Sequence, residues 1–151
     1  MRLTVYTDYS LRVLIYLAVQ KNRLATIPEI ASSYGISRNH LVKVGHQLGV
    51  YGYVITTRGI KGGLRLARSA DEINIGDVVR RMEPDMAVVP CLSPTKAFCP
   101  IVPSCRLRTV MEEARAAFLA VLDTYTLADL ASPRDELTLL LQISPMPSEK
   151  A

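Results

Sequence analysis

Three cysteines lie close together in the chain and are of a type that can bind a metal cluster. Cys91, Cys99 and Cys105 fall within one stretch of 15 residues, and the other 136 of the 151 residues contain no cysteine. A structural zinc site usually combines C-x2–4-C pairs with four ligands, and that pattern is absent. Nucleophilic catalysis is not expected, because a catalytic cysteine needs a nearby base and both histidines belong to a different predicted element. Three well-spaced thiolates suit an iron–sulfur cluster, and the alternative is a thiol switch in which two cysteines pair.

The segment around these cysteines is predicted to be a long loop. Residues 84–105 contain five of the nine prolines of the chain, namely Pro84, Pro90, Pro94, Pro100 and Pro103. Such a segment cannot form a regular helix or a central strand, and a loop of this length is usually functional or disordered. If three cysteines held a four-iron cluster here, the fourth iron would need a weaker, non-thiolate ligand. That iron would then be the reactive one.

Charge is distributed unevenly along the chain, whose formal net charge is +4. Residues 1–83 hold 12 Lys and Arg against 6 Asp and Glu, a balance of +6, whereas residues 84–151 hold 6 against 8, a balance of −2. No acidic residue occurs between Ile30 and Ala70, where the basic residues are Arg38, Lys43, Arg58, Lys61, Arg65 and Arg68. This pattern favours a polyanionic partner, and an ordinary solvated basic surface is the alternative.

Residues 26–50 have the form of a helix-turn-helix. Residues 26–29 (TIPE) are a capping box with proline in the first turn, which predicts a helix start. Gly35 suits the end of that short helix, and Ser37 suits the start of the next one. In the second helix the residues predicted to face inward are Leu41, Val44, Gly45 and Leu48. Helical periodicity then places Asn39, Lys43 and His46 on the outward face.

A β-hairpin is predicted directly after this unit. Residues 53–57 are β-branched and aromatic, residues 59–63 contain three glycines, and residues 64–66 alternate as a second strand would. A helix-turn-helix followed by a hairpin with a basic tip is a winged helix, whose second helix enters the major groove while the wing reaches the backbone or minor groove. The candidate DNA-binding residues are Ser37, Arg38, Asn39, His40, Lys43, Arg58 and Lys61.

Further helices are predicted on either side of the winged helix. The first is expected to begin near Thr7 or Asp8, either of which suits an N-cap. Residues 73–83 are expected to form a short helix that Pro84 closes. Residues 106–125 read as a long helix with an apolar stripe that resembles a coiled-coil seam, so we expect it to pair with a second copy of the chain. Residues 144–151 are expected to be disordered.

These predictions give a mainly α fold, a winged helix-turn-helix with a small β-hairpin wing and a long dimerisation helix. The expected divisions are residues 1–83 for DNA binding, 84–105 for the cysteine loop, 106–131 for the dimerisation helix with a short helix after it, and 132–151 for a C-terminal segment. The longest apolar run, residues 13–19, is too short to span a membrane. Asp8 and Arg12 interrupt what would be the apolar region of a signal peptide, so a cytoplasmic protein is expected.

Several motifs together resemble the bacterial iron–sulfur winged-helix transcription regulators. The resemblance covers about residues 1–131 and rests on residues 1–4 (MRLT), 7–9 (TDY), 37–43 (SRNHLVK), the glycine-rich wing at 58–63 and the three cysteines. Within the family, residues 37–43 and 122–130 (LDTYTLADL) are most similar to the nitric-oxide-sensing repressors. One branch of the family carries a histidine three positions after the last cysteine. This chain has Arg108 there and so departs from that branch.

The resemblance implies a homodimeric, non-enzymatic repressor that binds a pseudo-palindromic DNA operator. It implies a [4Fe-4S] cluster, with [2Fe-2S] as the alternative, bound by Cys91, Cys99, Cys105 and an aspartate from the partner chain. The matching aspartate is Asp8, for which an N-cap role is the alternative. Nitric oxide would nitrosylate or remove the cluster and so release the operator. Iron or redox sensing with the same cluster is the alternative signal, and a redox or electron-transfer protein with a winged-helix interaction module is the alternative class.

Overall fold

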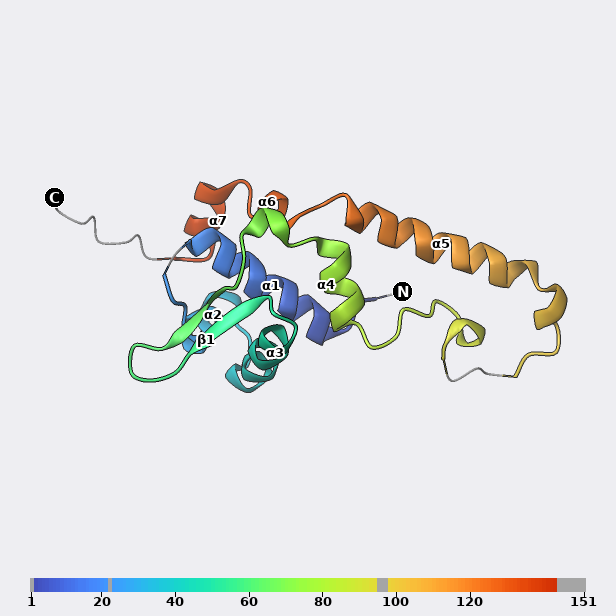
Figure 1. Cartoon of the computed structure of the whole chain (residues 1–151), viewed down its shortest axis with the longest axis horizontal. Coiled ribbons are helices and arrows are strands. Elements are labelled where there is room, and N and C mark those ends of the chain that lie inside the picture. The colour runs from blue at the N-terminus through green and yellow to red at the C-terminus, as the bar shows by residue number, and fades with distance from the viewer. Residues whose placement is uncertain (1, 22, 95–97, 144–151) are drawn as a thin grey trace.

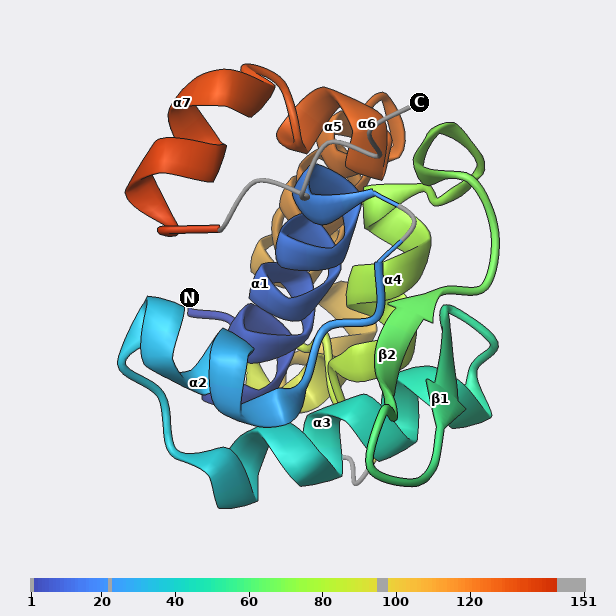
Figure 2. The same cartoon turned by 90° about the vertical axis from the view of Figure 1, so that its left-hand side faces the viewer.

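The computed structural model describes residues 2–21, 23–94 and 98–143, so the disorder expected for residues 144–151 lies outside the described part of the chain. Helix α1 (Val5–Gln20) runs through the middle of the globular body, and the other elements of the body surround it (Figure 2). The long helix α5 (Arg106–Asp123) projects from this body together with the cysteine loop (Figure 1). The predicted fold class, mainly helical with a two-stranded hairpin, is confirmed.

Helix α1 begins earlier than the sequence suggested. Its N-cap is Thr4, whose side chain accepts a hydrogen bond from the main-chain N–H of Thr7. The prediction of an N-cap at Thr7 or Asp8 is therefore wrong, and Asp8 lies in the first turn of the helix. Thr4, Thr7 and Asp8 all belong to residue types that can cap a helix. The contact that favours Thr4 comes from Glu83, which is 79 residues away in the sequence.

The helix-turn-helix forms as predicted. Helix α2 (Ile27–Tyr34) starts with the capping box between Thr26 and Glu29 and ends at Gly35, whose φ of 64° is left-handed. Such a conformation suits glycine, which has no Cβ. Helix α3 (Arg38–Val50) follows with Ser37 as its N-cap.

The wing consists of strands β1 (Val54–Thr57) and β2 (Gly63–Leu66), which pair antiparallel with Val54 opposite Leu66. The hairpin also joins the chain ahead of α2, because the N–H of Ala25 donates to the Leu64 carbonyl at 2.9 Å and the N–H of Leu64 donates back at 2.7 Å. A side chain at Gly63 would collide with the main chain of Ala25, so this close approach requires glycine.

The C-terminal half begins with a short 3-10 turn, η1 (Ala70–Glu72), and helix α4 (Ile75–Met82), which is shorter than the expected 73–83. Two more 3-10 turns, η2 (Pro90–Leu92) and η3 (Val102–Ser104), interrupt the cysteine loop before α5. Helices α6 (Leu127–Leu130) and α7 (Arg134–Leu140) then return to the body. The sequence did not indicate α7. A hydrogen bond from Arg134 Nε to the Val19 carbonyl, at 2.8 Å, ties this helix to α1.

The hydrophobic core gathers around α1. Its fully buried side chains include Leu14, Ile30, Leu41, Leu48 and Ile73. The predicted inward stripe of α3 is confirmed, since all four of its residues are buried. In contrast, α5 has no buried residue along its 18 residues. Within the described part of the chain, no helix is both long and apolar enough to cross a membrane.

Candidate DNA-binding surface and cysteine loop

The outward face of α3 is open and carries no acidic side chain. The predicted DNA-binding residues of this segment, Ser37, Arg38, Asn39, His40 and Lys43, are all exposed, as is His46. None of the side chains of Arg38, Asn39 and Lys43 has a hydrogen-bond or ion-pair partner among the described residues. The amide and cationic groups of this face are therefore available for base edges and phosphates.

The wing adds two more cations next to this face. Arg58 and Lys61 are exposed at and beside the turn between β1 and β2. A hollow of about 340 Å³ separates α3 from the wing, and its walls are Ile27, Val42, Gly45, His46, Thr56, Arg58 and Leu64. Arg58 of the wing and His46 of the outward face of α3 thus border one hollow, whose lining does not include the other predicted DNA-binding residues.

Val42 is a residue of this surface that the sequence analysis missed. It is 56% exposed on α3, although the side chain is apolar. Its position next to Lys43 and on the wall of the hollow suits an apolar contact with a thymine methyl group. The sequence did contain a signal for Val42, because this apolar residue lies outside the inward stripe of α3, on a face that is otherwise polar.

The cysteine loop has two branches, residues 84–94 and residues 98–105 (Figure 1). Cys91 lies in η2, which packs against α5. Cys99 and Cys105 lie on the other branch, where two consecutive turns join them: Val102 N–H donates to the Cys99 carbonyl, and Cys105 N–H donates to the Val102 carbonyl, both at 3.3 Å. Cys105 is also the N-cap of α5.

All three cysteines are free thiols and are partly exposed. Among the described residues, no three side chains of His, Cys, Asp or Glu form a group that could hold a metal ion. The donor set nevertheless fits an iron–sulfur cluster, because thiolates are its usual ligands. Cys91 lies in a short 3-10 turn, Cys99 in irregular chain and Cys105 at a helix end, so none of them is inside an α-helix or a strand. The structure brings Cys99 and Cys105 onto one pair of turns and leaves Cys91 on the opposite branch.

Asp8 lies on the exposed side of the first turn of α1. Its carboxylate pairs with Arg12 at 2.9 Å, and both side chains remain more than 40% exposed. An ion pair this exposed stabilises a protein by less than about 1 kcal/mol. Because Thr4 caps the helix, Asp8 has no capping role and its carboxylate stays accessible to a second chain.

The apolar stripe of α5 is largely open to solvent. Leu107, Val110 and Val121 are 57%, 54% and 59% exposed, respectively. Leu119 and Leu122, on either side of the exposed Val121, pack against the core near the C-terminal end of the helix. A helix that leaves this much apolar surface open suits an interface with another chain.

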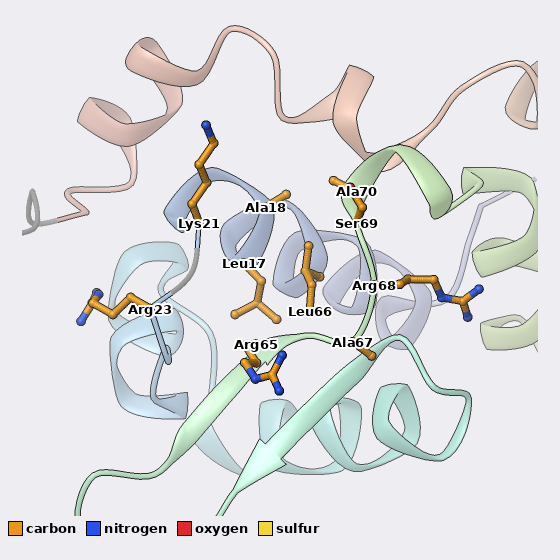
Figure 3. A pocket seen from close by; sticks show the side chains of 10 residues that line it. All are labelled: Leu17, Ala18, Lys21, Arg23, Arg65, Leu66, Ala67, Arg68, Ser69 and Ala70. Carbon is orange, nitrogen blue, oxygen red and sulfur yellow. The ribbon is translucent and has the colours of Figure 1, made fainter.

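A second, larger hollow of about 620 Å³ lies between α1 and β2, with Leu17 and Leu66 in its wall (Figure 3). Four cationic residues border it, but they do not converge. Arg23 is paired with Glu29 at 2.8 Å, and the Arg68 guanidinium lies over the ring of Tyr53 at 5.2 Å. Figure 3 shows these two side chains and Lys21 pointing away from one another, so the hollow is a poor anion site.

Comparison with known proteins identifies the family to which this chain belongs. A family model, Rrf2, described as an iron-dependent transcriptional regulator, matches residues 3–133. The chain belongs to the Rrf2 family. The curated relatives of this Rrf2 protein include the HTH-type transcriptional regulator NsrR of Bacillus subtilis (strain 168), which is 50% identical over 95% of this chain and 99% of the relative. NsrR of Shouchella clausii (strain KSM-K16) is 48% identical over 94% of this chain and 96% of the relative.

Solved structures agree with this assignment. The global cysteine regulator CymR of B. subtilis matches with a TM-score of 0.72 and 28% identity, over 88% of this chain and 98% of CymR. IscR of T. potens matches with a TM-score of 0.71 over 96% of this chain and 93% of IscR, and at 24% identity this likeness shows the fold alone. The chain is therefore an NsrR-like, DNA-binding transcriptional regulator of the Rrf2 family and not an enzyme, as the sequence predicted.

Proposed function

We propose that this Rrf2 protein is a homodimeric repressor that carries an iron–sulfur cluster and releases its operator when nitric oxide removes that cluster. The observation that carries the DNA-binding part is the open, carboxylate-free face of α3 beside the basic wing. In this arrangement Arg38 and Asn39 contact base edges, Val42 contacts a thymine methyl group, and Lys43, Arg58 and Lys61 contact phosphates. Ser37 and His40, at the start of α3, complete the contact surface.

The sensing part of the proposal rests on three free thiols that share one loop and on a relative named NsrR. Cys91, Cys99 and Cys105 would hold the cluster, and Asp8 of the second protomer would supply the remaining ligand. When bound, the cluster supplies iron that nitric oxide can coordinate. A hollow of about 340 Å³ beside Cys105, bordered by Arg108 and Glu112, gives a small molecule access to this end of the loop.

Dimerisation would place two recognition helices at a fixed spacing, which a pseudo-palindromic operator requires. The open stripe of α5 is the proposed contact between protomers. Because Cys105 is the N-cap of α5, the loop that would hold the cluster is continuous with the helix that would set this spacing. The division of the chain into residues 1–83, 84–105, 106–131 and 132–151 follows the same assignment of roles.

An iron-responsive, RirA-like regulator is the second candidate, and the description of the family as iron-dependent favours it. Both candidates use the same ligands, so the signal separates them. Anaerobically purified protein is mixed with a duplex that it has selected from a random DNA pool. The nitric oxide proposal expects several molecules of nitric oxide per cluster to bleach the cluster absorbance and abolish the gel shift. An iron chelator under anaerobic conditions is expected to leave both unchanged.

The opposite pattern, loss of binding with the chelator alone, would establish the iron-responsive alternative. DNA binding that is unchanged by cluster loss would overturn both. Counting iron and sulfide in the same preparation distinguishes [4Fe-4S] from [2Fe-2S]. A steep fall in affinity as salt rises is the expected sign of phosphate contacts in the complex.

A further inference from the structure

We infer that Glu83 is a positioning residue that couples the cysteine loop to the recognition helix through the first turn of α1. This inference rests on the proposed function, since it takes the loop as the sensing element and α3 as the DNA-reading element. Glu83 is the C-cap of α4, and Pro84, the first residue of the loop, follows it directly. Glu83 is thus the junction between the globular body and the loop.

The carboxylate of Glu83 is bound to the start of α1 by several hydrogen bonds. Its Oε2 accepts from the main-chain N–H of Thr4 at 3.1 Å, from Thr4 Oγ1 at 3.2 Å and from Thr7 Oγ1 at 2.5 Å. Thr7 is fully buried, whereas Thr4 and Glu83 are half-buried, so this contact lies at the edge of the core. A carboxylate at a helix N-terminus is favoured by the helix dipole as well as by the hydrogen bonds.

The same turn of α1 is bound to the middle of α3. Tyr6 lies between Thr4 and Thr7, and its hydroxyl donates to the main-chain carbonyl of Lys43 at 2.9 Å. One turn later, the ring of Tyr9 lies 6.1 Å from the ring of His40, measured between centroids.

The contacts form one continuous route within a single chain: loop, Glu83, Thr4 and Thr7, Tyr6, and the Lys43 segment of α3. A change in the loop that moves Glu83 shifts the first turn of α1, and Tyr6 and Tyr9 then move the helix segment that carries the DNA-reading side chains. This route does not depend on Asp8 or on a partner chain. Energetic coupling between the cysteine loop and α3 requires connected contacts whose arrangement both cluster binding and DNA binding can shift.

The test compares operator affinity with and without cluster in three full-length variants. Glu83→Gln weakens the charged acceptor, and Tyr6→Phe removes only the hydroxyl that reaches Lys43. Ser33→Ala is the matched control, because it deletes a 2.8 Å hydrogen bond from α2 to the Leu141 carbonyl, away from the route. The DNA is the duplex selected from a random pool by the wild-type dimer. The ratio of cluster-loaded to cluster-free affinity is expected to fall about fivefold or more in Glu83→Gln and Tyr6→Phe, and to keep its wild-type value in Ser33→Ala.

A second measurement does not depend on the loaded protein. In the cluster-free chain, amide hydrogen exchange in residues 38–50 is expected to rise in Glu83→Gln and Tyr6→Phe but not in Ser33→Ala. Unchanged affinity ratios in Tyr6→Phe, a variant that keeps the ring and the fold, would overturn the inference even if Glu83→Gln were too unstable to assay. If wild-type protein itself binds DNA equally with and without cluster, the proposed function fails instead, so the two failures are distinguishable.

Discussion

Arg80 and Asp123 form a bidentate ion pair that joins helix α4 to the last residue of the long helix α5. The Nη1–Oδ1 distance is 2.7 Å and the Nη2–Oδ2 distance is 2.5 Å. Asn74 reinforces the joint, because its side-chain amide donates to the Asp123 carbonyl at 2.7 Å. The C-terminal end of α5 is therefore fixed to the DNA-binding half, whereas its N-terminal end projects with Cys105. A rearrangement of the cysteine loop would therefore move the N-terminal end of α5 while its C-terminal end stays bound to α4.

The joint leaves no room for a side chain at position 76. A Cβ on Gly76 would overlap the Asp123 carboxylate, so Gly76→Ala is expected to displace Asp123 and open the pair with Arg80. Both side chains of this pair are 41% exposed, so opening it costs less than about 1 kcal/mol and should lower the melting temperature by only a few degrees. Gly49→Ala is the matched control in another helix, since its Cβ would meet only the Val54 carbonyl at 3.9 Å, and it should stabilise the protein by about 0.5 kcal/mol. Equal melting temperatures for the two variants would contradict this account.

Tyr53 and Asp77 give the fold a predictable dependence on pH. The buried Tyr53 hydroxyl donates to Asp77 Oδ2 at 2.6 Å, and this hydrogen bond, aided by Arg81, lowers the pKa of Asp77. A lowered pKa means that the contribution to stability is present above the unfolded value of about 3.9 and is lost as pH falls through the folded value. Tyr53→Phe is expected to cost about 1 kcal/mol at pH 7.

The stability difference between wild type and Tyr53→Phe should therefore shrink as pH falls below about 4, which urea unfolding between pH 7 and pH 3 would measure. Tyr34→Phe serves as control, because the Tyr34 hydroxyl makes no hydrogen bond within the described part of the chain. A constant difference across this pH range would show that Asp77 does not carry the effect.

Replacing Asn39 or Lys43 with alanine is expected to change DNA binding in two different ways. Lys43→Ala should weaken binding to all duplexes alike and reduce the slope of log affinity against log salt by about 1, as the loss of one phosphate contact does. Asn39→Ala should cost about 1–3 kcal/mol on the selected duplex and far less on random DNA. Equal losses of Asn39→Ala on selected and random DNA would argue against base readout.

The parts of this fold that the sequence predicted well have local causes. The capping box at Thr26 and Glu29, the left-handed Gly35 and the inward stripe of α3 all depend on residues within a few positions of one another. The β-branched residues and closely spaced glycines that predicted the hairpin are local signals of the same kind. Helical spacing predicted that Asn39, Lys43 and His46 lie on the outward face of α3, and the structure places all three on the exposed side. Their contact with DNA stays a prediction.

The parts that the sequence did not predict depend on long-range contacts. The N-cap of α1 was misplaced because Glu83 selects Thr4 over two neighbouring residues of similar capping ability. Helix α7 has only seven residues and is held by Arg134 bonding to α1 and by Ser33 bonding to Leu141. The coupling role of Glu83 had no signal in the sequence, since a single glutamate before a proline indicates only a helix end.

Asp8→Ala tests the proposed fourth ligand without disturbing the fold. Because Thr4 caps α1 and the Asp8–Arg12 pair is exposed, the variant should lose less than about 1 kcal/mol of stability. Its cluster absorbance should decay faster in air than that of wild type. Asp135→Ala, which removes an exposed carboxylate from the first turn of α7, should decay at the wild-type rate. Identical spectra and decay rates in all three proteins would exclude Asp8 as a ligand.

Val110 on α5 tests the proposed interface between protomers. The side chain is 54% exposed in the single chain, so Val110→Asp has no buried neighbour to disturb within one protomer and should leave the fold of that protomer intact. A charge buried in a paired helix interface would be costly, so the dimer should dissociate at least tenfold more readily in sedimentation equilibrium. Glu113→Ala lies off the apolar stripe and should leave the dissociation constant unchanged. A Val110→Asp protein that remains as dimeric as wild type would place the interface elsewhere than on this face of α5.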